Sequence, residues 1–216
     1  MIEITDTAAS MQDKLTIEFY KLANARIKRN APIGLAQAKA TTLAFLISTD
    51  TYQSLVSDEL AYHFGFIKGT EERVLRPILN TFVESIHYEF IPFSKTGGSF
   101  TFFGISDDYA DVLALPQAYI QGKNRSKFTT EYPLPWLNWL LLQGDEILVK
   151  DHKISIGAIS GRSGEAVMIE GGTWSIPSRF RGTPTNNWVT KMSPKGTKAI
   201  SDYDITMQKI LEGLLV

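Results

Sequence analysis

The chain has 216 residues, of which 44% are hydrophobic and 21% charged, and its formal net charge is −1. This composition is close to the globular average and supports a hydrophobic core, whereas the near-zero charge provides no overall attraction to nucleic acid. The chain has no cysteine, which excludes disulfides, cysteine-bound zinc and thiol catalysis and is typical of a reducing compartment. No apolar run approaches the ~20 residues of a membrane span, and the acidic N-terminus is unlike a signal peptide. We therefore expect a soluble intracellular product.

The first third of the chain has helical periodicity. Apolar residues recur every three to five positions in the first segment, which predicts a helix with one apolar stripe that runs from Met11, Leu15, Phe19 and Leu22 towards Ile27. We expect that helix to end before Pro32, because proline disfavours helical geometry at the preceding residue, and a second, alanine-rich helix to follow. Gly65 and Gly69 divide the next stretch into two helical pieces. Pro77 inside the second piece predicts a kink or a later start.

From residue 87 the pattern changes to that of strands. "HYEFIPF" and "SFTFFGI" flank the turn "SKTGG", which predicts a β-hairpin. "EILVKDHKISIGAI" indicates a second hairpin, and we expect both in one small antiparallel sheet. Between them, "DDYADVLALP" predicts a short helix, "QGKNRSKFTTEYP" an exposed loop, and "PLPWLNWLLLQGDEI" an aromatic helix. An amphipathic helix, "DITMQKILEGLLV", is expected near the C-terminus.

Helices and hairpins are mixed without a βαβ rhythm, so the predicted fold class is α+β. We expect one domain over residues 1–216, and residues 94–130 are where a boundary between two smaller units would fall. In the aromatic helix, one face is assigned to the core because its apolar residues share a helical side: Trp136, Leu137, Leu140 and Leu141.

Catalytic motifs are missing from the sequence. His63, His87 and His152 are far apart and fit no metal-binding spacing, so we interpret them as structural or surface residues. "GRSGEA" has its second glycine one position too early for a nucleophile turn, no histidine follows it, and it lacks the lysine of a phosphate loop. The pairs of adjacent carboxylates are typical of helix N-termini. We therefore assign no catalytic, cofactor-binding or metal-binding residue and expect no enzyme activity.

The stretch "GRSGEAVMIEGGTWSIPSRFRGTPTNNW", residues 161–188, is rich in glycine, proline, tryptophan and arginine. Tryptophan and arginine dominate the energetics of protein interfaces, which favours a docking loop over a catalytic one. The interface candidates are Arg162, Arg179, Arg181, Trp174 and Trp188. Two alternatives remain: each tryptophan could anchor the loop to its own core, and the arginines could pair internally with Glu165 or Glu170.

Basic residues cluster in three places. Residues 179–198 hold five basic residues and no acidic one, and "KNRSK" and "RIKR" each add three. Such clusters suit nucleic acid or an acidic protein face, and equally a solvated surface. A nucleic-acid-binding module using residues 179–198 is therefore one alternative function. A small hydrolase using Asp107, Asp108 and His152 is a weaker one.

Residues 54–192 resemble small virion proteins of tailed bacteriophages, namely the tail-completion and neck proteins between the head connector and the tail tube. The most specific part is the Ser-Gly turn ending in "VM", followed by "WSIP" and "FRGTPTNNW". "RIKRNAPIG" is similar to a basic-Asn-Ala-Pro stretch of some tail-completion proteins, with "IGL" in place of their Thr-Gly.

The resemblance implies a structural role at the head–tail joint, by docking in an oligomeric ring. The implied partners are copies of the chain itself and other virion proteins, such as the connector, tail tube or sheath, with DNA nearby. It implies no cofactor and no membrane. The implied location is the virion, and the host cytoplasm during assembly.

Overall fold

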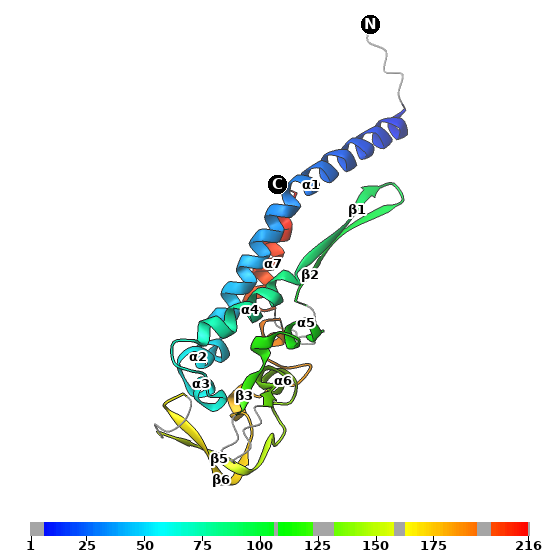
Figure 1. The fold of residues 1–216 in the computed structure, drawn as a ribbon. Helices are drawn as coiled ribbons and strands as arrows, with labels where there is room; N and C mark the ends of the chain where they lie inside the picture. The colour runs from blue at the N-terminus through cyan, green and yellow to red at the C-terminus, as the bar shows by residue number, and fades with distance from the viewer. Residues whose placement is uncertain (1–6, 106–107, 123–131, 158–162, 194–199, 216) are drawn as a thin grey trace.

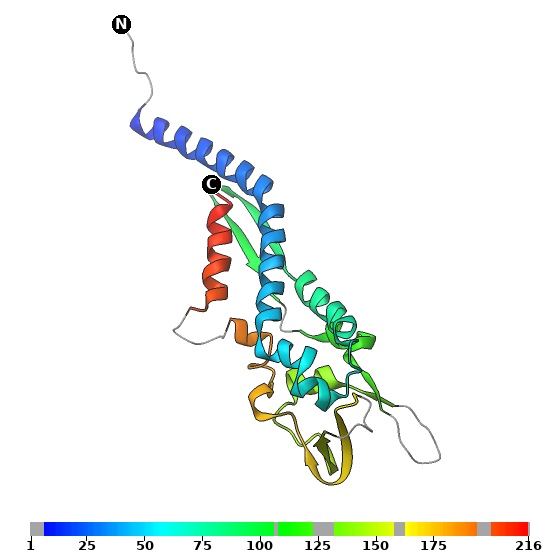
Figure 2. The same ribbon diagram turned by 90° about the vertical axis from the view of Figure 1, so that its left-hand side faces the viewer.

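The computed structural model describes residues 7–105, 108–122, 132–157, 163–193 and 200–215. A long helix, α1 (Ala8–Ser48), extends along much of the elongated molecule, and α7 (Asp202–Gly213) lies beside it (Figures 1 and 2). The other helices gather around the C-terminal end of α1: α2 (Asp50–Ser57), α3 (Glu59–Phe64), α4 (Glu71–Glu84), α5 (Ala110–Leu113) and α6 (Trp136–Leu142). The N-terminal part of α1 therefore extends away from most of the protein.

Helix α1 is continuous where two helices were expected. Pro32 lies inside it, so the prediction that the first helix ends before this residue is wrong. Proline removes one backbone donor and bends a helix, and α1 is bent near its middle (Figure 2). The helix persists because its buried side packs on both sides of the proline, with Ile27, Ala31 and Ala38 all covered. Pro77 likewise lies inside α4, which begins at Glu71, ahead of the proline.

The α+β class is confirmed, but the strands do not form one sheet. The described residues form three separate two-stranded antiparallel sheets, β1 with β2, β3 with β4 and β5 with β6. The strands are β1 (His87–Ser94), β2 (Gly97–Phe103), β3 (Ile120–Gly122), β4 (Tyr132–Leu134), β5 (Val149–Ile156) and β6 (Ala166–Trp174). The first hairpin is as expected, whereas the expected common sheet is not formed.

The second hairpin pairs differently from the sequence-based expectation. "EILVKDHKISIGAI" supplies only β5, and the partner strand β6 comes from the glycine-rich stretch at residues 161–188. Ile156 pairs with Ala166 and Val149 with Trp174. The glycines of β6 allow a bulge opposite Asp151, since Gly171 and Gly172 both adopt positive φ. The expected polar loop "QGKNRSKFTTEYP" begins in β3 and ends in β4, and residues 123–131 lie outside the described residues.

Hairpin β1–β2 lies along the N-terminal half of α1 (Figure 1). The Asn24 side chain donates to the Phe93 carbonyl at 2.9 Å and accepts from the Phe93 amide at 2.8 Å. Lys95 at the turn forms a 2.9 Å ion pair with Asp13. These contacts fix one side of the projecting helix and leave its other sides to solvent.

The main core surrounds α6. The four residues assigned to its buried face are all fully buried, which confirms that prediction. Trp136 packs on Phe64 and Phe66, with ring centroids 5.3 and 5.0 Å apart, and its indole N–H donates to the Gln117 carbonyl. The same hydrophobic cluster includes residues from α1 to α7, on both sides of the 94–130 segment.

Helix α7 is held against α1 by a polar contact and by close packing. A capping box at Ser201 and Asp204 starts the helix. Buried Tyr203 shares a 3.0 Å hydrogen bond with Thr42 of α1. At the other end, a Cβ added to Gly34 would lie 2.7 Å from a methyl carbon of Leu214, so glycine permits the two helices to approach.

Candidate functional site

The glycine-rich stretch begins with a tight turn whose serine is structural. Gly161 and Arg162 lie outside the described residues. Ser163 is buried, and its hydroxyl oxygen accepts from the backbone N–H groups of Glu165 and Ala166, both at 3.2 Å. Gly164 between them adopts φ +77°, a conformation that glycine favours. This turn leads into β6 and is stabilised by its serine.

Both candidate tryptophans belong to the core. Trp174 is 5% exposed and Trp188 is 2% exposed. The Trp188 indole N–H donates to Thr49 Oγ1 at 2.7 Å, at the junction of α1 and α2. The Trp174 indole N–H donates to His63 Nδ1 at 3.1 Å. Of the two roles considered for these residues, anchoring to their own core is the one these contacts support.

The described arginines of the stretch bind groups of their own chain. Arg179 contacts Glu59 at 2.8 Å and Asp58 at 3.4 Å, and its guanidinium lies 4.5 Å from the ring centroid of Phe180. Arg181 donates to the Ile176 carbonyl at 3.1 Å and to Ser175 at 3.2 Å. The arginines were expected either to dock on a partner or to pair internally with Glu165 or Glu170. Arg179 does pair internally, but with Asp58 and Glu59. Because the Arg179 side chain is largely exposed, its ion pairs contribute little stability.

Asn187 organises the end of the stretch. It is fully buried, and its side-chain amide donates to the Tyr109 hydroxyl and the Thr183 carbonyl, each at 3.0 Å. Its side-chain oxygen accepts from the backbone amides of Val189 and Thr190, at 3.0 and 3.1 Å. The asparagine of "NNW" therefore ties the loop to α5 and to itself, a role that the sequence analysis did not assign. Two adjacent asparagines before a tryptophan give no sequence signal that would single out Asn187 for such a role.

His63 links α3 to β6, and its surroundings change its pKa. Burial lowers the pKa of His63 below its usual value near 6.5, and the nearby Glu59 carboxylate opposes that shift by a smaller amount. The bond from the Trp174 indole requires an unprotonated Nδ1, so the neutral ring fits this position. His63 is therefore a structural residue whose protonation would break a contact in the core.

We expect acid to destabilise the protein through His63. A pKa lowered on folding means that the unfolded chain binds the proton more readily. Stability is then full above about pH 7 and falls as the pH decreases through 6.5 towards the lowered pKa. Melting temperatures measured from pH 8 to pH 5 should show this slope in the parent and in His152→Gln, and a smaller slope in His63→Gln. An equal slope in His63→Gln would contradict the assignment.

The hydrolase alternative gains no support. Asp107 lies outside the described residues. An Asp108 carboxylate oxygen accepts from the Ala110 amide at the start of α5, and the His152 ring contacts the Lys150 carbonyl on β5. Among the described residues, no three side chains of His, Asp or Glu are grouped so that they could hold a metal ion.

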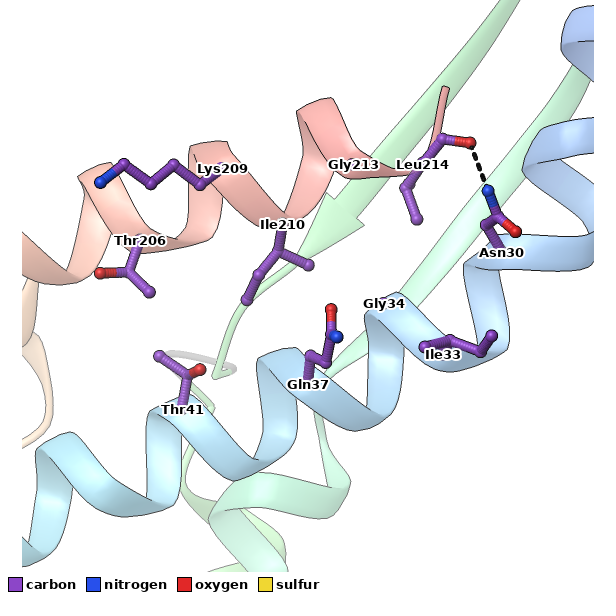
Figure 3. A pocket seen from close by; sticks show the side chains of 10 residues that line it. All are labelled: Asn30, Ile33, Gly34, Gln37, Thr41, Thr206, Lys209, Ile210, Gly213 and Leu214. Atoms are coloured by element: carbon purple, nitrogen blue, oxygen red, sulfur yellow. Dashed lines mark hydrogen bonds between the residues drawn. The ribbon is translucent and has the colours of Figure 1, made fainter. Parts of the chain in front are cut away.

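A groove of about 580 Å³ separates α1 from α7 (Figure 3). Its lining is mostly amide, hydroxyl and aliphatic, and Lys209 is the one titratable residue in it. Asn30 closes one end by donating to the Leu214 carbonyl at 3.1 Å. With one cation and no carboxylate or imidazole, the groove offers no acid–base pair for catalysis.

The exposed apolar surface of α1 is the feature that fits docking best. The α1 stripe (Met11, Leu15, Phe19 and Leu22) is the N-terminal part of the stripe found in the sequence, and its last three side chains are 72%, 66% and 63% exposed, whereas Ile27, where the predicted stripe ended, is buried. A stripe at helical spacing is usually covered by the protein's own core. Here the core lies at the other end of α1, so the stripe faces solvent in the single chain (Figure 1).

Three comparisons with known proteins found no counterpart: no family model, no curated protein and no solved structure matches this chain. Within the described part of the chain, no helix combines the length and apolar character required to cross a membrane.

Proposed function

We propose that this chain is a structural virion protein at the head–tail joint of a tailed bacteriophage, a neck or tail-completion protein that docks in a ring. The exposed α1 stripe carries this proposal. Burying a leucine or phenylalanine contributes about 1.5–3 kcal/mol, and a contiguous exposed set of such side chains marks an interaction site. The resemblance of residues 54–192 to tail-completion and neck proteins is the reason for proposing the head–tail joint as the place of docking.

The glycine-rich stretch supports this proposal as part of the folded body, whereas it was expected to be the docking loop itself. Trp188 and Asn187 hold their loop in the core, and Arg179 is paired with Asp58 and Glu59. The stretch thus builds a rigid body, and the projecting half of α1 presents the docking surface. A rigid body with a projecting apolar arm suits assembly, because little ordering is required on binding.

The nucleic-acid alternative is less favoured. Arg179 is neutralised by two carboxylates of its own chain, and Arg181 is bonded to Ile176 and Ser175. Lys195 and Lys198 lie outside the described residues. If phosphate contacts nevertheless dominated, duplex DNA would bind with a steep negative dependence on salt concentration.

The test is genetic. An amber codon at Trp136, in the genome that encodes the chain, should leave filled heads and separate tails in electron micrographs of a non-suppressing host. Suppression by a tryptophan-inserting strain should restore joined particles, and antibodies against the purified chain should label the joint. Complete infectious particles that lack the chain would refute the proposal.

A further inference from the structure

One edge of strand β2 pairs with β1, and its other edge has no partner among the described residues. Within the described part of the chain, β2 packs mainly on β1. Outside that ladder, the backbone of residues 98–103 makes no hydrogen bond with another described residue. Successive residues of a strand direct their N–H and C=O groups alternately to one side and the other. The outer edge of β2 is therefore a row of open backbone donors and acceptors.

Strand β2 also lacks the residues that keep a free edge from pairing. Charged side chains and proline protect edge strands in monomeric proteins. The other three long strands each contain such residues: Glu89 and Pro92 in β1, Lys153 in β5, and Glu170 in β6. The sequence of β2 is GGSFTFF, without charge or proline. Its outer edge is thus an unprotected template for a further strand.

The outer edge of β1, in contrast, is closed near the turn. Asn24 of α1 donates to the Phe93 carbonyl at 2.9 Å and accepts from the Phe93 amide at 2.8 Å, and the preceding Pro92 has no N–H. Helix α1 packs along β1 and makes no comparable contact with β2. A two-stranded hairpin is marginally stable in water and gains from additional strands. A further strand can therefore join this hairpin at β2.

We propose that β2 pairs antiparallel with β2 of a second copy, so that two hairpins form one four-stranded sheet. The charges of the strands select this occupant. Two β2 edges bring no charged side chain together, whereas β5 or β6 as the partner strand would place Lys153 or Glu170 against the uncharged edge. Identical edges also satisfy the symmetry of the commonest homo-oligomer, in which the same surface of both copies forms the contact.

The pairing would extend an aromatic cluster across the new contact. Tyr88, Phe100 and Phe102 lie on one face of the hairpin and are half-buried. The Phe100 ring centroid lies 5.3 Å from that of Tyr88 and 6.0 Å from that of Phe102. Directly opposite residues of antiparallel strands share a face. With Thr101 opposite its own copy, Phe100 of each chain lies opposite Phe102 of the other, which adds aromatic cross-strand pairs to the sheet.

This contact goes beyond the proposed function and does not depend on it. A two-fold contact joins two copies and does not by itself close a ring. The paired edge, residues 99–103, is short, so the interface is smaller than the ~800 Å² per partner of a standard stable complex. We therefore expect a dissociation constant on the order of 10–100 µM for the dimer.

Charge exchange at Thr101 tests the contact, because this residue would face its own copy. Thr101 is exposed and lies opposite Glu89 on β1, so Glu89→Gln is introduced first to remove the nearest charge within the hairpin. In that background, Thr101→Lys alone and Thr101→Glu alone should each raise the dissociation constant about tenfold or more. An equimolar mixture should restore dimers, since opposite charges then meet. Melting temperatures should stay close to that of the background protein.

A single introduced cysteine provides an independent readout. The chain has no cysteine, so one thiol per chain can form a disulfide only between copies. Opposite residues of antiparallel strands have Cα atoms about 4.5–5.5 Å apart, within the range of a disulfide. Under mild oxidation, Thr101→Cys should form covalent dimers roughly tenfold faster or more than Thr173→Cys. Thr173 is the matched control, because it is an exposed threonine in β6.

Other results would overturn the proposal. Equal association of the background protein and both charged variants would place the contact elsewhere, for example at the α1 stripe. A background protein that stays monomeric, or a mixture no more associated than its components, would mean that the two β2 edges do not pair. Equal rates of disulfide formation at residues 101 and 173 would mean the same. Separate heads and tails in the amber mutant would still support the proposed function after any of these failures.

Discussion

Replacing Trp136 by alanine should leave the protein insoluble or molten. The indole is fully buried between Phe64 and Phe66, and its N–H is bonded to the Gln117 carbonyl. Removing a buried tryptophan costs about 3–5 kcal/mol, which approaches the ~5–15 kcal/mol total stability of a typical protein of this kind. In whatever fraction stays soluble, the melting temperature should decrease by roughly 6–20 °C. Solubility and near-UV circular dichroism measure the effect.

Phe19→Ala is the matched control, because it also removes an aromatic ring. Phe19 is 66% exposed on the projecting part of α1, so its loss should change the melting temperature by no more than a degree or two. If Trp136→Ala melts like Phe19→Ala, the assignment of α6 to the centre of the core is wrong.

The aromatic helix could be predicted because its local signals agree. Proline precedes the start, large apolar residues occupy one helical side, and a glycine follows the end. Its buried face was therefore identified residue by residue. The α+β class could be predicted for a similar reason, because the spacing of apolar residues changes from helical to strand-like along the chain.

The length of α1 and the pairing of β5 could not be predicted, because both depend on distant parts of the chain. Local preference ends a helix before Pro32, and the packing of β1, α7 and α4 on α1 favours continuation. Strand β5 was expected to turn back on itself. Its partner instead begins ten residues later, at Ala166, in a stretch whose glycines made it look like a loop. Strand pairing is a long-range property that a short window does not contain.

The candidate docking surface also depends on contacts that are distant in the sequence. The spacing of the α1 stripe is visible in the sequence, but spacing alone does not say whether a core covers it. The decisive fact is that α7 ends at Gly213, beside the middle of α1, where Arg26 contacts the Leu215 carbonyl. Beyond that point the stripe continues into solvent. Conversely, Trp174 and Trp188 carried the strongest compositional signal for an interface and are buried.

Asn187→Ala should destabilise the protein nearly as much as the loss of Trp136. Its fully buried side chain donates to Tyr109 and Thr183 and accepts from Val189 and Thr190, and the bonds to Tyr109 and Val189 are themselves buried. Each net hydrogen bond contributes about 1 kcal/mol, and partners left unsatisfied in a buried site cost about 1–3 kcal/mol each. The sum of these losses is at least ~3 kcal/mol. Chemical denaturation should show a lower midpoint with an unchanged slope, because the same surface is exposed on unfolding.

Asn187→Asp and Asn186→Ala separate the role of the amide from that of the loop. The aspartate keeps the shape and the accepting oxygen but loses the donor to Tyr109 and buries a charge, so it should be as damaging as alanine at pH 7. Burial raises the pKa of such an aspartate, so its deficit relative to the parent should shrink as the pH falls and the carboxyl becomes protonated. Asn186 is the adjacent, exposed asparagine, and its alanine variant should unfold like the parent. Equal midpoints for the Asn186 and Asn187 variants would show that the loop, and not the buried amide, holds this part of the fold together.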